Sequence, residues 1–260
     1  MSTYVKLDIL DNHIALLTLN RPEAANALST KLLDELNQTV EQIKSSASVR
    51  VVIITGNGEK AFCAGADLKE RRNMNDEQVV QAVTYIGETI NHIEEIPVPV
   101  IAAINGVAFG GGLELALACD IRIMAATAKI GLTETSLAII PGAGGTQRLP
   151  RLIGIGQAKR FIYTATPIDA TEAFQLGLVE KVVTNDELTK ETIKMAEQIA
   201  KNGPIAIRAA KTAINAGIET DLQTALNIEH LSYLQTIKTK DRIEGLQAFS
   251  EKRKPNYIGK

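Results

Sequence analysis

The chain has 260 residues, of which 45% are hydrophobic and 22% are charged, and its formal net charge at pH 7 is −2. This composition is typical of a folded globular protein, and so weak a charge excludes the basic surface of most nucleic-acid-binding proteins. We expect no membrane span, because no apolar run reaches about 18 residues, and no signal peptide, because polar residues interrupt the N-terminal segment. Two distant cysteines, Cys63 and Cys119, predict reduced thiols and a cytoplasmic protein.

Hydrophobic spacing predicts strands and helices that alternate through the first half of the chain. In chain order we expect strands over residues 4–10 and 14–19, a helix over 29–46, a strand over 51–54, an irregular loop over 55–70 and a helix over 76–95. Ligand contacts gather in loops that follow strands of α/β sheets, so the loop over 55–70 is a candidate binding segment.

The second half begins with a strand over residues 98–104, which leads through a glycine run to an apolar helix from about residue 113. After a strand over 121–124 and a second glycine-rich loop over 141–146, the pattern becomes mostly helical. The later predicted elements are a strand over 178–183 and helices over 186–200, 204–216, 221–235 and 241–252. We place a domain boundary near residue 195, which divides the chain into 1–195 and 196–260.

The central strand, glycine run and helix form a strand–loop–helix unit of a parallel α/β core. Gly110, Gly111 and Gly112 carry no Cβ, so a ligand can approach the backbone closely, and the first N–H groups of the helix can hold negative charge. Glu114 is the one carboxylate in this apolar segment. Taken singly, the glycines also fit a tight turn, and Glu114 also fits a favourable partner of the helix dipole.

A second isolated glutamate, Glu134, precedes the second glycine-rich loop. If both carboxylates enter one dry cleft about 6 Å apart, their repulsion is on the order of 3 kcal/mol at an effective dielectric constant near 20. That energy corresponds to about two pKa units, enough to keep one glutamate protonated while the other is ionised. Such a pair suits the addition of water or the transfer of a proton. No nucleotide-binding glycine motif is present, and three histidines argue against a Ser-His-Asp triad or a histidine-rich metal site.

Three motifs carry a resemblance to a known family: Ala61-Phe62-Cys63-Ala64-Gly65-Ala66-Asp67-Leu68, the stretch from Asn105-Gly106 to Glu114-Leu115-Ala116, and Pro141-Gly142-Ala143-Gly144-Gly145-Thr146-Gln147-Arg148-Leu149. With these motifs the chain resembles the crotonase (enoyl-CoA hydratase/isomerase) superfamily from near its N-terminus to Asn256-Tyr257. The resemblance implies an α/β spiral of β-β-α turns with a C-terminal helical region that packs trimers, often paired into hexamers.

The resemblance also implies a site for a CoA thioester and a role for each matching residue. Glu114 would activate a water at C3 and Glu134 would deliver a proton to C2, while the backbone N–H groups of Ala66 and Gly111 would form the oxyanion hole. The remaining matching positions are Gly142 for the water, Ala64 and Leu68 for adenine, and Lys69, Phe249 and Lys252 for the CoA or acyl end, sometimes across a subunit boundary. No metal or separate cofactor is implied, because coenzyme A is part of the substrate.

The presence of both glutamates favours a short-chain enoyl-CoA hydratase of β-oxidation over an isomerase. Thr133-Glu134-Thr135, Leu137 to Ile140 and Leu149-Pro150-Arg151 also resemble methylglutaconyl-CoA hydratase of leucine breakdown, whose substrate has a second carboxylate that Arg71 or Arg72 could bind. RNA binding, known on that branch, is disfavoured by the net-acidic helix over 29–46. A catalytically silent scaffold is disfavoured by the intact pair of glutamates.

Overall fold

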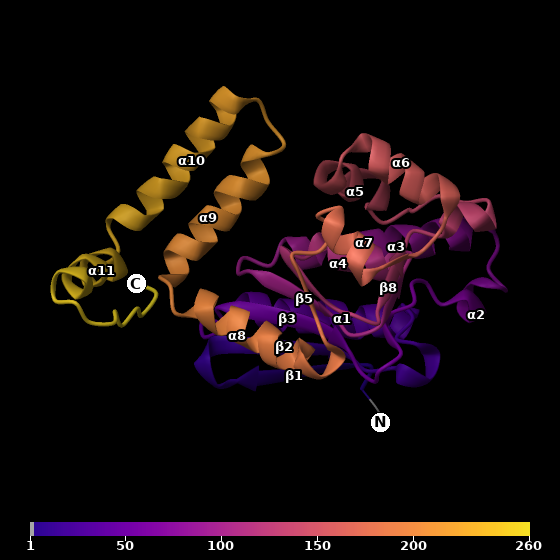
Figure 1. The fold of residues 1–260 in the computed structure, drawn as a ribbon, viewed down its shortest axis with the longest axis horizontal. Helices are drawn as coiled ribbons and strands as arrows, with labels where there is room; N and C mark the ends of the chain where they lie inside the picture. The colour runs from indigo at the N-terminus through magenta and orange to yellow at the C-terminus, as the bar shows by residue number, and fades with distance from the viewer. Residues whose placement is uncertain (1–2) are drawn as a thin grey trace.

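The structure is a computed structural model that describes residues 3–260. Two sheets form its centre (Figure 1). The larger sheet has the order β1 (Val5–Leu10), β2 (Ile14–Leu19), β3 (Val51–Gly56), β5 (Val100–Ile104), β7 (Ile121–Ala125), β10 (Lys181–Val183). The smaller sheet has the order β4 (Ala61–Cys63), β6 (Val107–Phe109), β8 (Lys129–Gly131), β9 (Ile168–Asp169).

Both sheets are mostly parallel. In the larger sheet only β1 and β2 run antiparallel, with Leu10 opposite Ile14. The strands β3 and β5 are almost continuously apolar and buried, which is typical of parallel strands covered on both faces. In the smaller sheet β4, β6 and β8 are parallel and β9 is antiparallel to β8.

The chain forms the expected spiral of β-β-α turns. In each of three successive turns one strand joins the larger sheet and the next joins the smaller sheet: β3 then β4, β5 then β6, and β7 then β8. This arrangement confirms the predicted fold class. It also aligns the segments that follow β4, β6 and β8 beside one another, because these strands are parallel neighbours.

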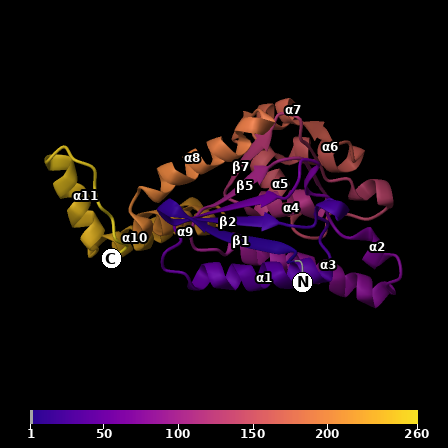
Figure 2. The ribbon, with the colours of Figure 1, turned by 90° about the horizontal axis from the view of Figure 1, so that it is seen from below.

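Helices cover both faces of the larger sheet. Figure 2 shows α1 (Thr30–Ser45) and α3 (Asp76–Glu94) on one side of the strands and α8 (Leu188–Ala200) on the other. The helix α1 begins where predicted, because the side chain of Ser29 accepts a hydrogen bond from Leu32 N. Asn75 and Gln78 form a reciprocal capping box at the start of α3. Both cysteines are buried free thiols.

Short helices connect and cover the spiral. They are α2 (Leu68–Arg71), α4 (Gly111–Ala118), α5 (Gly145–Ile153), α6 (Ile155–Thr164), α7 (Ala170–Gln175), and the 3₁₀ turns η1 (Asp11–His13), η2 (Pro22–Ala24), η3 (Glu134–Leu137) and η4 (Asn185–Glu187). Every residue of α4 is buried, so this helix lies in the interior of the molecule.

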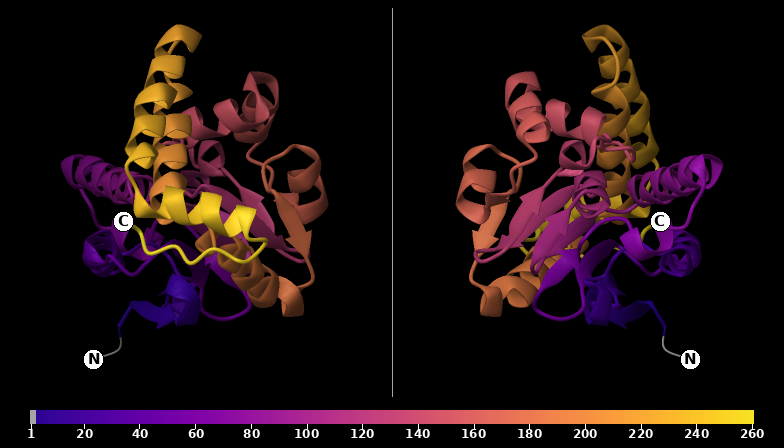
Figure 3. Two further views of the ribbon diagram at one scale, coloured as in Figure 1. Left: turned by 90° about the vertical axis from the view of Figure 1, so that its left-hand side faces the viewer. Right: turned by 90° about the vertical axis from the view of Figure 1, so that its right-hand side faces the viewer.

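The C-terminal helices α9 (Pro204–Gly217), α10 (Leu222–Ile237) and α11 (Lys240–Ser250) stand away from the sheets (Figures 1 and 3). They expose many large apolar side chains, among them Ile214, Ile218, Leu222, Leu226, Leu231, Leu234, Leu246 and Phe249. The predicted boundary near residue 195 falls inside α8, which packs on the larger sheet; the division into two domains stays a prediction. Within residues 3–260, no helix combines the length and apolar character that crossing a bilayer requires.

Candidate active site

A cavity of about 650 Å³ lies where the segments after β4, β6 and β8 meet α3. Among the described residues 3–260, the charged ones that line it are Arg71, Glu114 and Glu134. Apolar side chains and bare backbone make up most of the remainder: Ala64, Gly65, Ala66, Leu68, Val79, Val83, Ile86, Gly110, Gly111, Thr133, Leu137, Ile139, Ile140, Gly142 and Ala143. Two carboxylates in so apolar a chamber are the kind of arrangement that shifts pKa values for proton transfer.

Glu114 lies in α4 and is 3% exposed. Its Oε1 atom accepts hydrogen bonds from the backbone N–H groups of Ala143 and Gly145, both at 2.8 Å. An ideal Cβ on Gly145 would lie only 3.0 Å from this oxygen, so a glycine is needed here for the Glu114 carboxylate to come close to the backbone of the loop. The second glycine-rich loop therefore holds the Glu114 carboxylate in one orientation. These two donors were not predicted from the sequence, although the glycines of that loop indicate that its backbone N–H groups are accessible to a hydrogen-bond acceptor.

Glu134 begins η3 and lies against the glycine run at Gly110. An ideal Cβ on Gly110 would lie 2.9 Å from Glu134 Oε1, and Gly110 has φ +50° and ψ −124°, a conformation that excludes most side chains. Glu134 Oε2 is buried and has no hydrogen-bond partner among residues 3–260. A buried oxygen without a partner is costly, so this carboxyl is suited to a bound water or to a substrate proton.

The surroundings of the two glutamates give them different tendencies to ionise. Burial, together with the charge of Glu114, raises the pKa of Glu134 to about 7, against the opposing effects of a backbone hydrogen bond and of Arg71. Burial also raises the pKa of Glu114, and the Gly145 and Ala143 amides and the charges of Arg148 and Arg71 offset only part of that rise. Near neutral pH, the hydrogen bonds to Glu114 favour its carboxylate, while Glu134 is poised to hold a proton.

Two backbone amides face the same cavity. Leu28 pairs with Ala66 in a parallel bridge in which Leu28 N donates to Gly65 O and Asp67 N donates to Leu28 O, so the Ala66 amide points away from Leu28. Gly111 is the first residue of α4, so its N–H has no acceptor within the helix. An ideal Cβ on Gly111 would lie 3.8 Å from Ala66 N. Among residues 3–260 neither amide donates to another backbone group, which leaves both available to one ligand oxygen.

An ion pair fixes the backbone next to Ala66. Asp67 caps α2 by accepting hydrogen bonds from Lys69 N and Glu70 N, and its other oxygen pairs with Arg21 at 2.5 Å. The Arg21 guanidinium holds the pKa of Asp67 below its usual range, although burial alone would raise it. The carboxylate therefore stays charged, and the strand-to-helix turn that presents the Ala66 amide is tied to the loop that carries Arg21.

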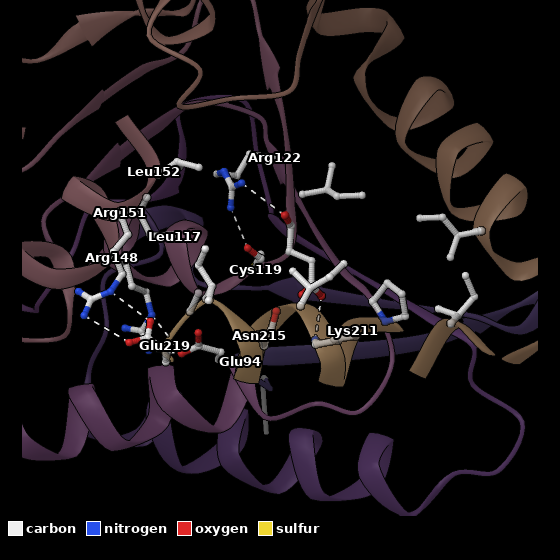
Figure 4. A pocket seen from close by; sticks show the side chains of 18 residues that line it. Glu94, Leu117, Cys119, Arg122, Arg148, Arg151, Leu152, Lys211, Asn215 and Glu219 are labelled. Carbon is white, nitrogen blue, oxygen red and sulfur yellow. Dashed lines mark hydrogen bonds and ion pairs between the residues drawn. The ribbon is translucent and has the colours of Figure 1, made fainter. Parts of the chain in front are cut away.

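Arg148 connects the second glycine-rich loop to α3. Its guanidinium donates to Ala143 O at 3.2 Å, to Asn91 Oδ1 at 2.8 Å and to Glu94 in an ion pair, so it joins α5 to α3. Arg148 also borders a second cavity, of about 560 Å³, between α9 and the far side of α4. Figure 4 shows Glu94, Arg148, Arg151 and Glu219 together at one end of that cavity.

The charges of the second cavity are already paired. Arg151 pairs with Glu219 at 3.1 Å, and Lys211 pairs with Asp120 at 2.8 Å. Its lining lacks the combination of buried carboxylates and unpaired amides found in the first cavity. The first cavity is therefore the candidate active site.

Most of the predicted site residues lie in the first cavity. Its lining includes Ala64, Ala66, Leu68, Gly111, Glu114, Glu134 and Gly142. Lys69 is exposed on α2 and does not line it. Phe249 is 87% exposed on α11, Lys252 follows this helix, and Figure 1 shows α11 and α2 at opposite ends of the molecule. One chain thus does not bring Phe249 and Lys252 to its own cavity, and their predicted role requires a second copy.

The structure also separates the two arginines that the sequence left as alternatives. Arg71 lines the cavity, whereas Arg72 is exposed outside it.

Comparison with known proteins identifies the family of the chain. The family model described as enoyl-CoA hydratase/isomerase matches residues 10–260. The crystal structure of an enoyl-CoA hydratase from Bacillus anthracis is 58% identical, with a TM-score of 0.98, and the match covers 99% of this chain and 100% of that one. Mitochondrial methylglutaconyl-CoA hydratase of Mus musculus is 51% identical over 250 residues, 95% of this chain and 80% of the relative.

A further relative is YngF of Bacillus subtilis (strain 168), whose enoyl-CoA hydratase/isomerase name is provisional. It is 56% identical over 259 residues, which cover 100% of both chains. The match of the family model over nearly the whole chain and the identity of these relatives confirm the resemblance seen in the three sequence motifs. The chain therefore belongs to the enoyl-CoA hydratase/isomerase family, the crotonase superfamily.

Proposed function

We propose that this protein is an enoyl-CoA hydratase that adds water syn across the 2,3 double bond of a trans-2-enoyl-CoA to give a 3-hydroxyacyl-CoA. The observation that carries the proposal is the placement of one buried glutamate, one partly buried glutamate and two unpaired amides around one cavity. The amides supply a binding site for a thioester oxygen, and the glutamates supply a base and an acid that can act on the same ligand.

The reaction follows from the different environments of these groups. The N–H groups of Ala66 and Gly111 bind the thioester oxygen and stabilise the negative charge that develops on it. Glu114 removes a proton from a water as the water oxygen bonds to C3, and Glu134 donates its proton to C2. We assign the water to the backbone N–H of Gly142, a residue that also lines the cavity. No metal or separate cofactor takes part in this scheme.

Binding of the CoA part is assigned to the edge of the cavity. Ala64 and Leu68 lie there and can contact the adenine through their backbones, with Lys69 exposed beside them. We propose that Phe249 and Lys252 reach the cavity of a neighbouring copy in a homotrimer or homohexamer. The exposed apolar side chains of α9 to α11 support such an assembly, because an apolar surface of this extent normally packs against another molecule.

Methylglutaconyl-CoA hydration is the second candidate. It is favoured by the mammalian relatives of that name and by the position of Arg71 in the cavity. RNA binding gains no support from α1, where Lys31 lies 4.0 Å from Glu35 and Lys44 lies 3.6 Å from Glu41. We propose that this reaction serves fatty-acid or branched-chain acyl-CoA breakdown, and that the protein works in the cytoplasm.

A substrate panel tests the proposal. Loss of the ultraviolet absorbance of the conjugated thioester is measured with crotonyl-CoA, longer trans-2-enoyl-CoAs and 3-methylglutaconyl-CoA. Formation of 3-hydroxyacyl-CoA from any of them supports a hydratase. Migration of the double bond without uptake of water would identify an isomerase instead, and turnover of crotonyl-CoA without turnover of methylglutaconyl-CoA would remove the second candidate.

The pH dependence of kcat/KM is expected to be bell-shaped. Glu134 must be protonated to act as the acid, so activity falls as pH rises through its pKa of about 7. Glu114 must be ionised, so activity also falls when acid protonates it. The two carboxyls interact, so the measured values belong to the pair. A rate that keeps rising well above neutral pH would contradict the assignment of Glu134 as the acid.

The substitution Gly145→Ala is expected to reduce kcat by about ten-fold. The new Cβ would lie 3.0 Å from Glu114 Oε1 and from Leu132 Cδ1, so the carboxylate must move away from its two amide donors; a displacement of about 1 Å can cost up to 100-fold. Gly156→Ala in α6 is the matched control, because nothing lies within 4 Å of its Cβ position. Steady-state hydration by both variants checks the prediction, which fails if Gly145→Ala retains the rate of Gly156→Ala.

A further inference from the structure

Asn26 is a fully buried polar residue in the loop over residues 20–29, which joins β2 to α1, and it does not line the cavity. Its side chain bonds to three backbone groups: Oδ1 accepts from Arg21 N at 2.9 Å, and Nδ2 donates to Asn57 O at 3.1 Å and to Ala61 O at 2.8 Å. Both hydrogens of the carboxamide nitrogen are therefore used, as is its oxygen. Because Ala61 begins β4, this side chain joins the loop to the strand that leads to Ala66.

The backbone conformation of Asn26 does not by itself require an asparagine. Asn26 has φ +54°, in the left-handed region that asparagine tolerates better than most residues. The preceding residue, Ala25, has φ +51° without a polar side chain. What distinguishes position 26 is the carboxamide, whose bonds are all to buried backbone. A buried carbonyl that loses its donor is destabilised, so these bonds hold the loop against β4.

Two backbone hydrogen bonds connect the same loop to the residues after β4. Ala64 N donates to Ala25 O at 3.0 Å, and Leu28 N donates to Gly65 O at 2.8 Å. In a trans peptide the C=O and N–H groups point in opposite directions. The bond from Leu28 to Gly65 O therefore turns the N–H of Ala66 away from the loop and towards the cavity that Ala66 lines. The direction of this donor depends on where the loop is held.

The Gly65–Ala66 peptide also packs closely against the end of β6. An ideal Cβ on Gly65 would lie 2.7 Å from Phe109 O and 3.3 Å from Gly111 N. The second amide donor thus lies beside the first. Since Gly111 belongs to α4 and not to the loop over residues 20–29, a displacement of the loop would move one donor relative to the other.

We propose that Asn26 is a positioning residue of the oxyanion hole: its carboxamide holds the loop over residues 20–29 on β4 and thereby directs the Ala66 N–H at the thioester oxygen. This inference rests on the proposed hydratase function and adds a residue that acts on the reaction through another group. An oxyanion hole is effective because its donors are aimed before charge develops on the substrate. A side chain that fixes one donor from outside the cavity contributes to the rate without touching the ligand.

The test uses Asn26→Gly, because glycine adopts φ +54° without strain and lacks only the carboxamide. The kcat for crotonyl-CoA hydration is expected to fall by about 10- to 100-fold, since misplacing a group at the reacting centre by about 1 Å can cost up to 100-fold. The shape of the pH profile should not change, because Glu114 and Glu134 belong to other segments of the chain.

A spectroscopic measurement reports on the donor itself. Butyryl-CoA labelled isotopically at its carbonyl carbon has no double bond to hydrate, and hydrogen bonds to the carbonyl lower its stretching frequency in infrared difference spectra. Wild-type protein should lower this frequency on binding, and Asn26→Gly should keep only about half of the shift, since one of two donors is misdirected. Spectra are taken well below the measured melting temperature of each variant. If Asn26→Gly does not fold, Asn26→Ser, whose hydroxyl is too short to replace the carboxamide, is measured in its place.

Asn20→Gly is the matched control, because it removes two side-chain hydrogen bonds from the same loop, one to Thr3 O and one from Asn57, and neither involves β4. It should retain the wild-type kcat and the full carbonyl shift. A full shift or a wild-type kcat in Asn26→Gly would overturn the inference even if stability falls, because Asn26 would then be structural only. Equal losses in Asn20→Gly, or hydration by wild type without any carbonyl shift, would also overturn it. If wild type neither shifts the carbonyl frequency nor hydrates crotonyl-CoA, the proposed function itself is wrong.

Discussion

Glu114→Gln is expected to lower kcat for crotonyl-CoA hydration by about 10³- to 10⁴-fold, the upper range for loss of a general base. The glutamine Oε1 can still accept the hydrogen bonds from Ala143 and Gly145 at the positions that Glu114 Oε1 occupies, so the loop should keep its conformation. What disappears is the group that takes the proton from water. Steady-state rates, together with calorimetric measurement of CoA-thioester affinity, separate the two effects.

Glu172→Gln is the control for Glu114→Gln. Glu172 lies in α7, outside the cavity, where it pairs with Arg160 at 2.5 Å near the surface. Removing its charge should leave kcat within about two-fold of wild type, because such surface pairs contribute little. Near-normal hydration by Glu114→Gln, or loss of thioester binding with no separate loss of rate, would contradict the assignment of Glu114 as the base.

Glu134→Gln is expected to lower the same rate by about 10²- to 10⁴-fold, because the amide cannot deliver a proton to C2. The same substitution should stabilise the folded protein above neutral pH, although it lowers the rate. Burial raises the pKa of Glu134 from 4.5 to about 7 on folding, so the folded protein favours the protonated form. The corresponding contribution to stability is present below pH 4.5 and is lost as pH rises towards and through 7.

Glutamine is neutral at every pH and does not suffer this loss. The melting temperature of Glu134→Gln relative to wild type should therefore rise between about pH 4.5 and pH 8, in step with the titration of Glu134. Thermal unfolding at both pH values checks the prediction. A difference in melting temperature that does not change with pH would show that burial does not disfavour the charge of Glu134.

Long periodic elements were predictable from the sequence. The helix α1 lies within the predicted range of 29–46, because the Ser29 cap and the spacing of the buried Leu32, Leu36 and Val40 are both local signals. The strands of the smaller sheet were missed, since β4 and β6 have three residues each and β9 has two. Such short segments carry no measurable periodicity, and only tertiary pairing makes them strands.

The parts of the site that consist of glycine-rich backbone and isolated carboxylates were predictable from the sequence. Glu114 and Glu134 stand out in apolar or glycine-rich segments, and the structure places both in one cavity. The hydrogen bonds from Ala143 and Gly145 to Glu114 could not be foreseen, because they join residues 29 and 31 positions apart through loop geometry. The choice of Arg71 over Arg72 likewise depends on which side of the short helix α2 faces the cavity.

The joint action of Glu114 and Glu134 on one thioester is tested most directly by a double-mutant cycle on kcat. Hydration of crotonyl-CoA is compared for wild type, Glu114→Gln, Glu134→Gln and the variant that carries both changes. Groups that act as one unit are strongly non-additive, so the double variant should be about as slow as the slower single variant. Losses that multiply in the double variant, or a single variant that hydrates at nearly the wild-type rate, would contradict a two-glutamate site.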